Sequence, residues 1–394
     1  MVLTHKQEEG LKIAVSRYYN HDPYTTISGY AGTGKSTLVK FIISALNIHP
    51  EDVAYVAYTG KAALILKEKN CPNATTAHKL LYKSYPRPDG TFYNKPLRPL
   101  EKQYKLIIVD EVSMLPIEMW ELLLSHHIHV IALGDPEQLG PVKSADNHIL
   151  DNPHIFLDEV MRQAQESEII RLTMDIRKRK PLRYCDGKEV KVISQNNLID
   201  GMYMWADVVL SGTNQTKRAV DMDIRNMLFG TRDPEPIEGD KVMCLQNDWD
   251  QVSFFGDVLV NGLTGTISNI DKDYGVPLLN VRLTADFLPD GTCDNLDFIP
   301  DEAYFHNLLI DYNKIVYGNS TVTSENFKKF DRHGKPREFD YAYCLTCHKA
   351  QGSEYNNVLV LDERLPGDHF RWLYTAATRA KDKLIIIKDF RLGG

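Results

Sequence analysis

A glycine-rich loop between a predicted strand and a predicted helix constrains the fold of this chain more than any other feature. Residues 25–27 are β-branched and predict a buried strand, residues 29–36 (GYAGTGKS) match the pattern G-x-x-x-x-G-K-[ST], and an apolar helix follows over 37–46. The three glycines let successive N–H groups and the helix N-terminus converge on one polyphosphate. Lys35 is then placed for the β- and γ-phosphates and Ser36 for Mg²⁺. The alternative is a turn that fits the pattern by chance, and the flanking strand and helix argue against it.

Two adjacent acids close a second buried strand. Residues 105–111 (KLIIVDE) are apolar up to Asp110 and Glu111. An acid at a strand end beside a phosphate loop holds Mg²⁺ through water, and the next acid can activate the attacking water. We therefore expect Asp110 to serve the metal and Glu111 to act as general base. A simple strand-end cap is the other interpretation, and the position of the pair along the α/β pattern argues against it.

Further strand-to-helix junctions follow the phosphate loop. Residues 53–58 predict a strand, and helices open after it at Thr59-Gly60 and again just before His78. Such junctions lie at the carboxyl ends of parallel strands, where ligands bind in open α/β sheets. Thr59, Gly60 and His78 can thus offer hydroxyl, N–H and imidazole contacts to a second ligand. Helix capping is the alternative, and for Thr76 it explains the residue at least as well.

The loop after the next predicted strand, 129–133, is a third candidate. It reads GDPEQLGP over 134–141, and Gln138 there can sense a γ-phosphate. For the other residues of this loop an ordinary βα connection is an equally good interpretation.

The segment 79–105 interrupts the α/β pattern and is basic. It holds seven Lys or Arg against two acids, and Asp89-Gly90 is a hairpin signal with Phe92 close by. A basic hairpin with aromatic residues near its tip suits contact with bases and phosphates. A surface excursion without function is the alternative.

The charge distribution qualifies the net charge. A net charge of -7 over 394 residues argues at first against a nucleic-acid partner, because phosphate binding requires a basic face. Residues 171–191, however, hold eight Lys or Arg against three acids, whereas 286–311 hold seven acids and no Lys or Arg. The acidic stretch alone equals the whole net charge, so other surfaces can be basic. Either basic run taken alone is also typical of a solvated helix face.

The second half repeats the α/β pattern without a second phosphate loop. After a helix over 166–179, a strand over 207–210, a helix over 213–228 and a strand over 241–245 are predicted, but residues 211–217 lack the Gly-Lys pair. A second lobe of this kind is best explained as a partner that closes over the first lobe's nucleotide.

An arginine from the second lobe can stabilise charge on a γ-phosphate, and Arg162 and Arg379 are the candidates. Residues 256–338 predict short strands with glycine turns, as in a small β-barrel insertion. The α/β pattern returns at 340–344.

The cysteines and the N-terminus indicate a cytosolic protein. Six scattered cysteines fit a reducing compartment, and neither an export signal nor an apolar run of membrane-spanning length is evident. The sequence C-x-x-C-H at Cys344 to His348 fits a haem-attachment pattern. We do not expect haem, because the pattern ends a buried strand without an export signal, nor zinc, because no second ligand pair is evident.

The ordered motifs resemble those of superfamily 1 helicases, and most closely those of the Dda and RecD type. The resemblance is carried above all by residues 348–354 (HKAQGSE) and 374–379 (YTAATR), and it extends from Gln7 to the last twenty residues. The other matching positions are 29–36, 59–60, 76–78, 110–111, 134–138, Arg162, 213–214 and 346–354.

The resemblance implies an α/β fold of two RecA-like P-loop NTPase lobes with two insertions. Residues 1–78 and 106–160 would form the first lobe and 79–105 a β-hairpin pin. Residues 161–255 and 339–394 would form the second lobe, with 256–338 an SH3-like β-barrel.

The activity it implies is ATP-dependent translocation along single-stranded DNA, 5'-to-3', with unwinding of duplex in replication, recombination or repair. Single-stranded and fork DNA are the expected partners, and a single-strand-binding or replisome protein is a further candidate. A monomer is expected, with ATP and Mg²⁺ as cofactors.

The resemblance also implies roles for single residues. The catalytic residues would be Lys35, Asp110, Glu111, Gln138, Arg162 and Arg379. The nucleotide would contact Gln7, Gly29, Ala31, Gly32, Thr33, Gly34, Lys35, Ser36, Thr37, Gly352 and Glu354, with Ser36 and Asp110 at the metal. The strand would contact Thr59, Gly60, Lys61, His78, Phe92, Thr213, Asn214, Thr346 and His348.

Two other classes of function remain as rivals. A P-loop kinase for a small molecule would not need Arg162 and Arg379, and its ATPase would not respond to DNA. A nucleic-acid clamp without turnover is disfavoured by the intact Lys35 and Glu111. A nuclease is disfavoured because no further cluster of acidic or His ligands is evident.

Overall fold

The structure is a computed structural model. It describes residues 3–86, 92–140, 147–160, 166–245, 248–252, 258–259, 261–271, 278–285, 304–311 and 337–393. The chain divides into two compact units: unit 1 comprises residues 1–85, 94–212 and 346–394, and unit 2 comprises 86–93 and 213–345.

Unit 1 contains a first six-stranded sheet in which every pair of neighbouring strands is parallel. Across the sheet its strands are β3 (Ala74–Thr76), β2 (Val53–Ala57), β6 (Leu106–Val109), β7 (Val130–Gly134), β1 (Tyr24–Gly29) and β8 (Ile155–Leu157). The accompanying helices are α1 (His5–Tyr19), α2 (Lys35–Ala45), α3 (Gly60–Glu68), α4 (Ala77–Leu81) and α5 (Ile117–Leu124), with short 3-10 turns η1 (Pro50–Asp52) and η2 (Val112–Met114).

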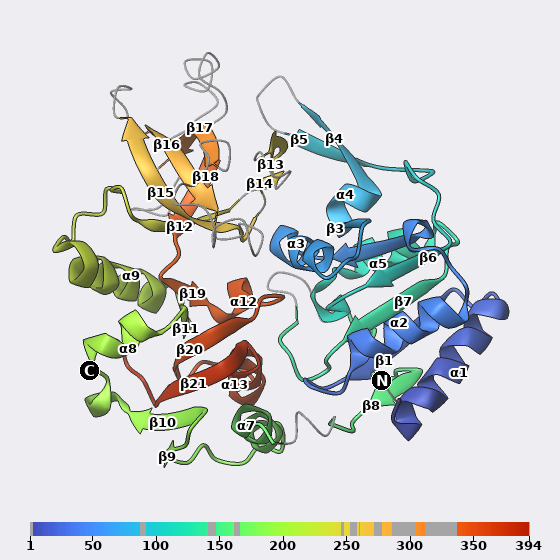
Figure 1. Ribbon diagram of the computed structural model, residues 1–394, viewed down its shortest axis with the longest axis horizontal. Helices are drawn as coiled ribbons and strands as arrows, with labels where there is room; N and C mark the ends of the chain where they lie inside the picture. The colour runs from blue at the N-terminus through green and yellow to red at the C-terminus, as the bar shows by residue number, and fades with distance from the viewer. Residues whose placement is uncertain are drawn as a thin grey trace, which may run out of the picture. The chain divides into compact units, whose positions relative to one another are not determined.

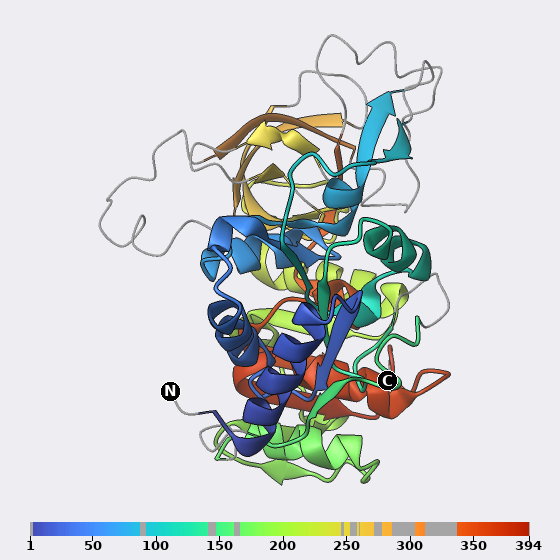
Figure 2. The same cartoon turned by 90° about the vertical axis from the view of Figure 1, so that its right-hand side faces the viewer.

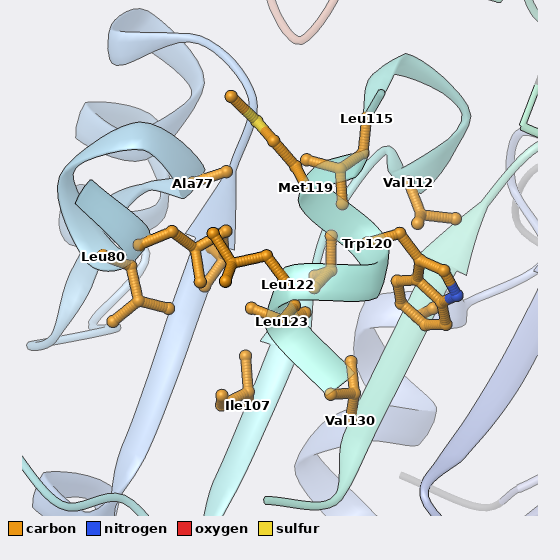
Figure 3. Close-up of a cluster of buried hydrophobic side chains, with 14 of the residues drawn as sticks. Ala77, Leu80, Ile107, Val112, Leu115, Met119, Trp120, Leu122, Leu123 and Val130 are labelled. Atoms are coloured by element: carbon orange, nitrogen blue, oxygen red, sulfur yellow. The ribbon is translucent and has the colours of Figure 1, made fainter. Parts of the chain in front are cut away.

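The central strands of this sheet are apolar on both faces, because helices cover both. Alternate residues belong to two separate cores: Ile107 and Val109 of β6 pack with α4 and α5, whereas Leu106 and Ile108 pack with α1 and α2. Trp120 of α5 lies in the first of these cores (Figure 3). In the second, α1 lies beside β1 and α2 (Figures 1 and 2). The two cores fix the carboxyl ends of β1, β6 and β7 relative to one another.

A second six-stranded sheet follows, mostly parallel. Across the sheet its strands are β19 (Cys344–Thr346), β11 (Val208–Ser211), β20 (Tyr355–Leu361), β21 (Ala380–Lys388), β10 (Val190–Ser194) and β9 (Cys185–Asp186). The pairs of β11 with β20, β20 with β21 and β21 with β10 are parallel, and β9 is antiparallel to β10. Its helices are α7 (Glu168–Arg177), α8 (Asp200–Trp205), α12 (Cys347–Ala350) and α13 (His369–Ala377), with the turn η3 (Gln195–Asn197). Helix α7 packs beside α13 and β21 (Figure 1).

Unit 2 is built from one long helix and a closed five-stranded barrel. The helix is α9 (Asn214–Phe229), and the barrel strands are β12 (Lys241–Cys244), β15 (Thr264–Asp271), β16 (Leu278–Ala285), β17 (Tyr304–Asp311) and β18 (Arg337–Tyr341). Two short two-stranded sheets complete the list of strands. In unit 2, β13 (Asp248–Val252) pairs antiparallel with β14 (Val258–Leu259), and β4 (Tyr82–Pro86) pairs with β5 (Phe92–Pro96) in a sheet whose residues are divided between the two units.

The α/β class expected from the sequence is confirmed, but two strands belong elsewhere than expected. From the sequence, strand β12 and the segment that ends at Tyr341 were expected to be parts of the second α/β lobe. In the structure β12 pairs antiparallel with β15 and with β18, which is the strand that ends at Tyr341. Both β12 and β18 are therefore strands of the barrel. A short apolar strand after a helix has the same sequence pattern in an α/β sheet and in a barrel, because the two differ only in the strands with which it pairs.

Two buried ion pairs hold α9 within unit 2. Arg225 is fully buried and donates to both carboxylate oxygens of Asp240, at 2.8 and 2.9 Å, with its guanidinium 4.5 Å from the centre of the Tyr341 ring. Lys217 forms a buried pair with Asp221 and also contacts Asp340 of β18. These charges fix α9 to the barrel strands that follow it.

In the described part of the chain, none of the helices combines the length and the apolar character that a membrane crossing requires.

Candidate nucleotide site

The phosphate loop connects β1 to α2 and requires glycine at three positions. Gly32 and Gly34 have φ of 76° and 78°, in the left-handed region that glycine adopts at no steric cost. A Cβ on Gly29 would lie 2.8 Å from both the carbonyl oxygen of Leu157 and Oγ1 of Thr33. The loop can therefore keep this close course only with the glycines of its sequence pattern.

Lys35 is the cation of this loop. Its Nζ donates to the carbonyl oxygens of Gly29 and Tyr30, at 2.7 and 3.1 Å. Burial raises the pKa of Asp110 and that of Glu111, and the charge of Lys35 opposes this rise at both carboxyl groups. The charge of Lys35 therefore acts on both the loop and the two acids. Ser36 and Thr37 lie in the first turn of α2.

Asp110 and Glu111 end β6 as expected. The N–H of Glu111 donates to Oδ1 of Asp110 at 3.0 Å, and Glu111 has φ of 50°, a left-handed conformation that is uncommon for a residue other than glycine. Burial and the neighbouring charge of Asp110 raise the pKa of Glu111 to about 7, against the opposing charge of Arg379. Burial likewise raises the pKa of Asp110, against Lys35. A carboxyl with a pKa near neutrality is suited to act as a general base.

The loop after β7 is bound by residues of the second sheet. Five hydrogen bonds connect it to α13 and its surroundings: Tyr374 OH to Asp135 Oδ2 (2.6 Å), Arg371 Nη2 to Pro136 O (3.0 Å), Arg379 Nη2 to Gln138 Oε1 (3.1 Å), Leu139 N to Thr375 Oγ1 (2.9 Å) and Gln351 Nε2 to Leu139 O (2.8 Å). The predicted phosphate sensor and the predicted arginine are thus in direct contact.

Arg379 follows the C-terminal end of α13 and is nearly buried. Besides Gln138, it donates to the carbonyl oxygens of Thr375 and Ser353, both at 3.2 Å. These bonds fix the guanidinium direction, and its charge acts on Glu111. The second predicted arginine, Arg162, lies outside the described residues.

Gln7 has both ends of its side-chain amide engaged. Thr4 caps α1 in a capping box, in which Oε1 of Gln7 accepts from the N–H of Thr4 at 3.0 Å. Its Nε2 donates to the carbonyl oxygen of Thr33 at 3.1 Å, and only 1% of the residue is exposed. The structure thus places Gln7 directly beneath the phosphate loop, which it ties to the start of α1.

The remaining predicted nucleotide contacts divide between two places. Gly352 has φ of 75°, and a Cβ there would lie 3.0 Å from Cβ of Ala62 in α3. Glu354 is exposed, and its charge contributes to the raised pKa of Asp110. Gly352 therefore lies against the helix of the predicted strand contacts, and Glu354 lies close enough to the acids to affect them.

The predicted strand contacts lie mainly at helix starts. Thr59, Thr76 and Thr213 accept from backbone N–H groups as N-caps of α3, α4 and α9, so the capping interpretation of Thr76 is confirmed. Thr346 is the N-cap residue of α12. Of the other predicted strand contacts, Gly60 and Asn214 are the first residues of α3 and α9, and His348 lies within α12. His78 lies in α4, and its ring is close to the rings of Tyr58 and Tyr82.

Two predicted strand contacts need separate comment. Lys61 is 8% exposed, and its Nζ lies 3.4 Å from the hydroxyl of Tyr355. Phe92 opens β5, and its side chain lies outside the described residues.

The sequence interpretation missed the aromatic contacts of the phosphate loop. Tyr374 OH accepts from the N–H of Ala31 at 3.2 Å, and the guanidinium of Arg177 lies 3.5 Å from the centre of the Tyr30 ring. Tyr374 opens the motif at 374–379, in which the sequence alone suggests a role only for the arginine. No local pattern links Arg177 to residue 30, because the contact joins two different sheets.

Cys344 and Cys347, the cysteines of the haem-like pattern, are fully buried, and burial raises the pKa of the Cys347 thiol to about 12. Across the described ranges, His, Cys, Asp and Glu side chains form no group of three or more that could hold a metal ion.

Comparison with known proteins relates the chain to helicases. The model of the AAA domain family matches residues 3–200, and that of the UvrD-like helicase C-terminal domain matches residues 341–387. The ATP-dependent RecD2 DNA helicase of Deinococcus radiodurans is 30% identical over 91% of this chain and 46% of its own length. The ATP-dependent DNA helicase Dda of phage T4 is 32% identical over 43% of this chain and 39% of its own.

The chain thus spans less than half the length of these two relatives. Among solved structures, the Pif1 helicase from Bacteroides, in complex with ADP-AlF3 and single-stranded DNA, has the same fold. It covers 100% of this chain with a TM-score of 0.56 at 16% identity.

Proposed function

The chain belongs to the AAA domain family, whose model matches residues 3–200, and from this premise we propose that it is an ATP-dependent DNA helicase of superfamily 1B. The observation that carries the proposal is the hydrogen bond between Arg379 and Gln138. It brings an arginine of the second sheet to the loop beside the phosphate loop of the first. Hydrolysis that needs groups from both sheets is coupled to their relative position, as a motor requires.

The residues present fit ATP hydrolysis. Glu111 would accept a proton from the attacking water, whose oxygen bonds to the γ-phosphorus as the bond to the β–γ bridging oxygen breaks, leaving ADP and inorganic phosphate. Lys35 and Arg379 would stabilise the charge that develops on the transferred group. Gln138, held by Arg379, would orient the water or report the γ-phosphate.

The donors of Ser36 and Asp110 fit Mg²⁺. They are a hydroxyl at the first turn of α2 and a carboxylate at the end of β6, and both are the hard oxygen ligands that this ion prefers. When bound, Mg²⁺ neutralises charge on the β- and γ-phosphates.

The single-residue assignments beyond this chemistry are part of the proposal. Gln7 would hydrogen-bond to adenine. For this it has the second hydrogen of Nε2 and the second lone pair of Oε1, which its bonds to Thr33 and Thr4 do not use. The helix starts at Thr59, Gly60, His78, Thr346 and His348 would contact the strand. The β4–β5 pair would separate strands, and the barrel would be the SH3-like insertion of this family. Contacts through stacking and phosphate charge would tolerate any sequence.

The test is strand displacement on forked substrates, made of DNA or of RNA, that carry a single 5' or 3' tail. The proposal expects ATP- and Mg²⁺-dependent unwinding of the DNA fork with the 5' tail, which also fixes the polarity as 5'-to-3'. The Lys35→Ala variant serves as control and should lose both turnover and unwinding.

The rival classes give different results in the same experiment. A small-molecule kinase would hydrolyse ATP without response to oligonucleotide, and a clamp would bind the fork but leave it intact with ATP present. Unwinding by Lys35→Ala at the wild-type rate would refute the motor. Light scattering during the assay would report whether the active species is a monomer, and addition of a single-strand-binding protein would test that partner.

A further inference from the structure

The hydroxyl of Tyr374 connects the second sheet to the phosphate loop. It accepts from the N–H of Ala31 at 3.2 Å and donates to Oδ2 of Asp135 at 2.6 Å. Tyr374 is 2% exposed and Asp135 is fully buried. A hydroxyl is required here, because only a group that both donates and accepts can satisfy a buried N–H and a buried carboxylate together.

The neighbouring residue of the loop is held from the same direction. Arg177, at the C-terminal end of α7, lies with its guanidinium 3.5 Å from the centre of the Tyr30 ring. The edge of that ring also meets Phe156 of β8, with the two ring centres 5.3 Å apart. The Tyr30 ring is therefore in contact with a cation of the second sheet and an aromatic of the first, an arrangement in which the cation is attracted to the ring face.

We infer that Tyr374 and Arg177 are positioning residues, which hold the Tyr30–Ala31 dipeptide of the phosphate loop to the second sheet during ATP hydrolysis. The inference rests on the proposed function and adds residues to its site. Tyr374 lies in α13, just over one turn before Arg379. The contact that holds the loop therefore also fixes the helix end that delivers the arginine to Gln138.

This role separates nucleotide binding from turnover. Tyr374 and Arg177 contact residues 30 and 31, whereas the glycine-rich backbone of 32–36 supplies most of the N–H groups for the phosphates, so most of the affinity for nucleotide should survive their loss. The placement of Arg379 does depend on α13, so the rate of the chemical step should fall. Misplacement of a catalytic group by about 1 Å can reduce a rate by roughly a hundredfold.

The first test compares Tyr374→Phe with the matched control Tyr343→Phe. The hydroxyl of Tyr343 has the same pattern in unit 2: it donates to the buried Asp240 at 2.9 Å and accepts from the N–H of Lys241 at 3.0 Å. Steady-state ATPase kinetics with and without an oligothymidylate, the Kd of a fluorescent ADP and the melting temperature are measured for both. We expect Tyr374→Phe to lower kcat about tenfold or more with KM and Kd within about twofold, and Tyr343→Phe to lower only the melting temperature.

The second test examines Arg177. Arg177→Ala should lower kcat without weakening ADP binding, and Arg177→Lys should restore much of the rate because a cation over the Tyr30 ring is kept. Equal kcat for Tyr374→Phe and wild type, or parallel loss of Kd and kcat in all variants, would overturn the inference.

The wild-type protein distinguishes the two claims. Lack of stimulation by oligonucleotide would count against the proposed motor, whereas the ratio of variant to wild-type turnover without oligonucleotide judges the positioning role on its own.

Discussion

Arg379 and Gln138 are 241 positions apart in the chain and lie in hydrogen-bond contact, with 3.1 Å between Nη2 and Oε1. One follows α13 of the second sheet and the other follows β7 of the first. Neither can move far from the other without breaking this bond, so in the proposed mechanism Gln138 would transmit a change at the phosphates to the second sheet.

This contact supports the proposed role of Arg379 in the transition state. Arg379→Ala should lower kcat by about a thousandfold, the lower end of the range known for arginines that stabilise phosphoryl transfer. Arg379→Lys should recover only part of it, because an ammonium cannot keep the bonds to Gln138, Thr375 and Ser353 together. Rapid-quench measurement of ATP cleavage checks this, and wild-type cleavage by Arg379→Ala would exclude the assignment.

The raised pKa of Glu111, about 7, predicts the pH dependence of turnover. A general base must be deprotonated, so kcat should fall about tenfold per pH unit below 7 and level off above it. A kcat profile from pH 5.5 to 9 measures this. Glu111→Gln should lose turnover at every pH, and a wild-type rate that stays constant down to pH 5.5 would contradict the role.

The same shift predicts a pH dependence of stability. The folded-state pKa of Glu111 lies above its ordinary value, so between pH 4.5 and about 7 the native state holds a proton that the unfolded chain releases. Stability from this group is present at low pH and is lost as pH rises through 7. Glu111→Gln should therefore melt higher than wild type at pH 8 and close to it at pH 4.5. Scanning calorimetry at both values checks the difference, which should not appear for the exposed Glu118→Gln.

Gly352 should not tolerate a side chain. Alanine there must adopt φ near 75° and place Cβ 3.0 Å from that of Ala62. Gly230 offers the control, because its φ is 68° and no atom lies within 4 Å of the position that a Cβ would take. Gly230→Ala should cost about 1 kcal/mol of unfolding free energy, and Gly352→Ala should cost more and also slow ATP turnover. Equal effects in urea denaturation would mean that the Ala62 contact has no consequence.

The buried pair of Arg225 and Asp240 should dominate the stability of unit 2. Arg225→Met leaves a buried carboxylate without its cation and should lower the unfolding free energy by about 3–5 kcal/mol. Arg232→Met removes an exposed pair with Asp223 and should cost below about 1 kcal/mol. Chemical denaturation followed by far-ultraviolet circular dichroism compares the two.

The strands, loop and helix that make up the candidate site at the first sheet could be predicted well because their patterns are local in sequence. The loop of residues 29–36, the strand before it and the acids at 110–111 are contiguous patterns, and their strands are parallel neighbours whose ends meet. The N-cap at Thr4 can be recognised for the same reason, since a capping box lies within four residues.

The contacts between sheets could not be predicted in this way. Tyr374 and Arg177 resemble ordinary helix residues, and their roles follow from which surfaces α13 and α7 face. The expected place of the barrel strand β12 was wrong for a related reason: its apolar pattern is satisfied equally by a parallel and an antiparallel neighbour.

The closure of the barrel in unit 2 has a consequence for how this chain meets other polypeptides. Since β12 bonds to β18 on one edge and to β15 on the other, the barrel closes on itself and both edges of this strand are paired. Neither edge of β12 is therefore a template on which another polypeptide could add a strand. This strand cannot seed self-association through main-chain pairing.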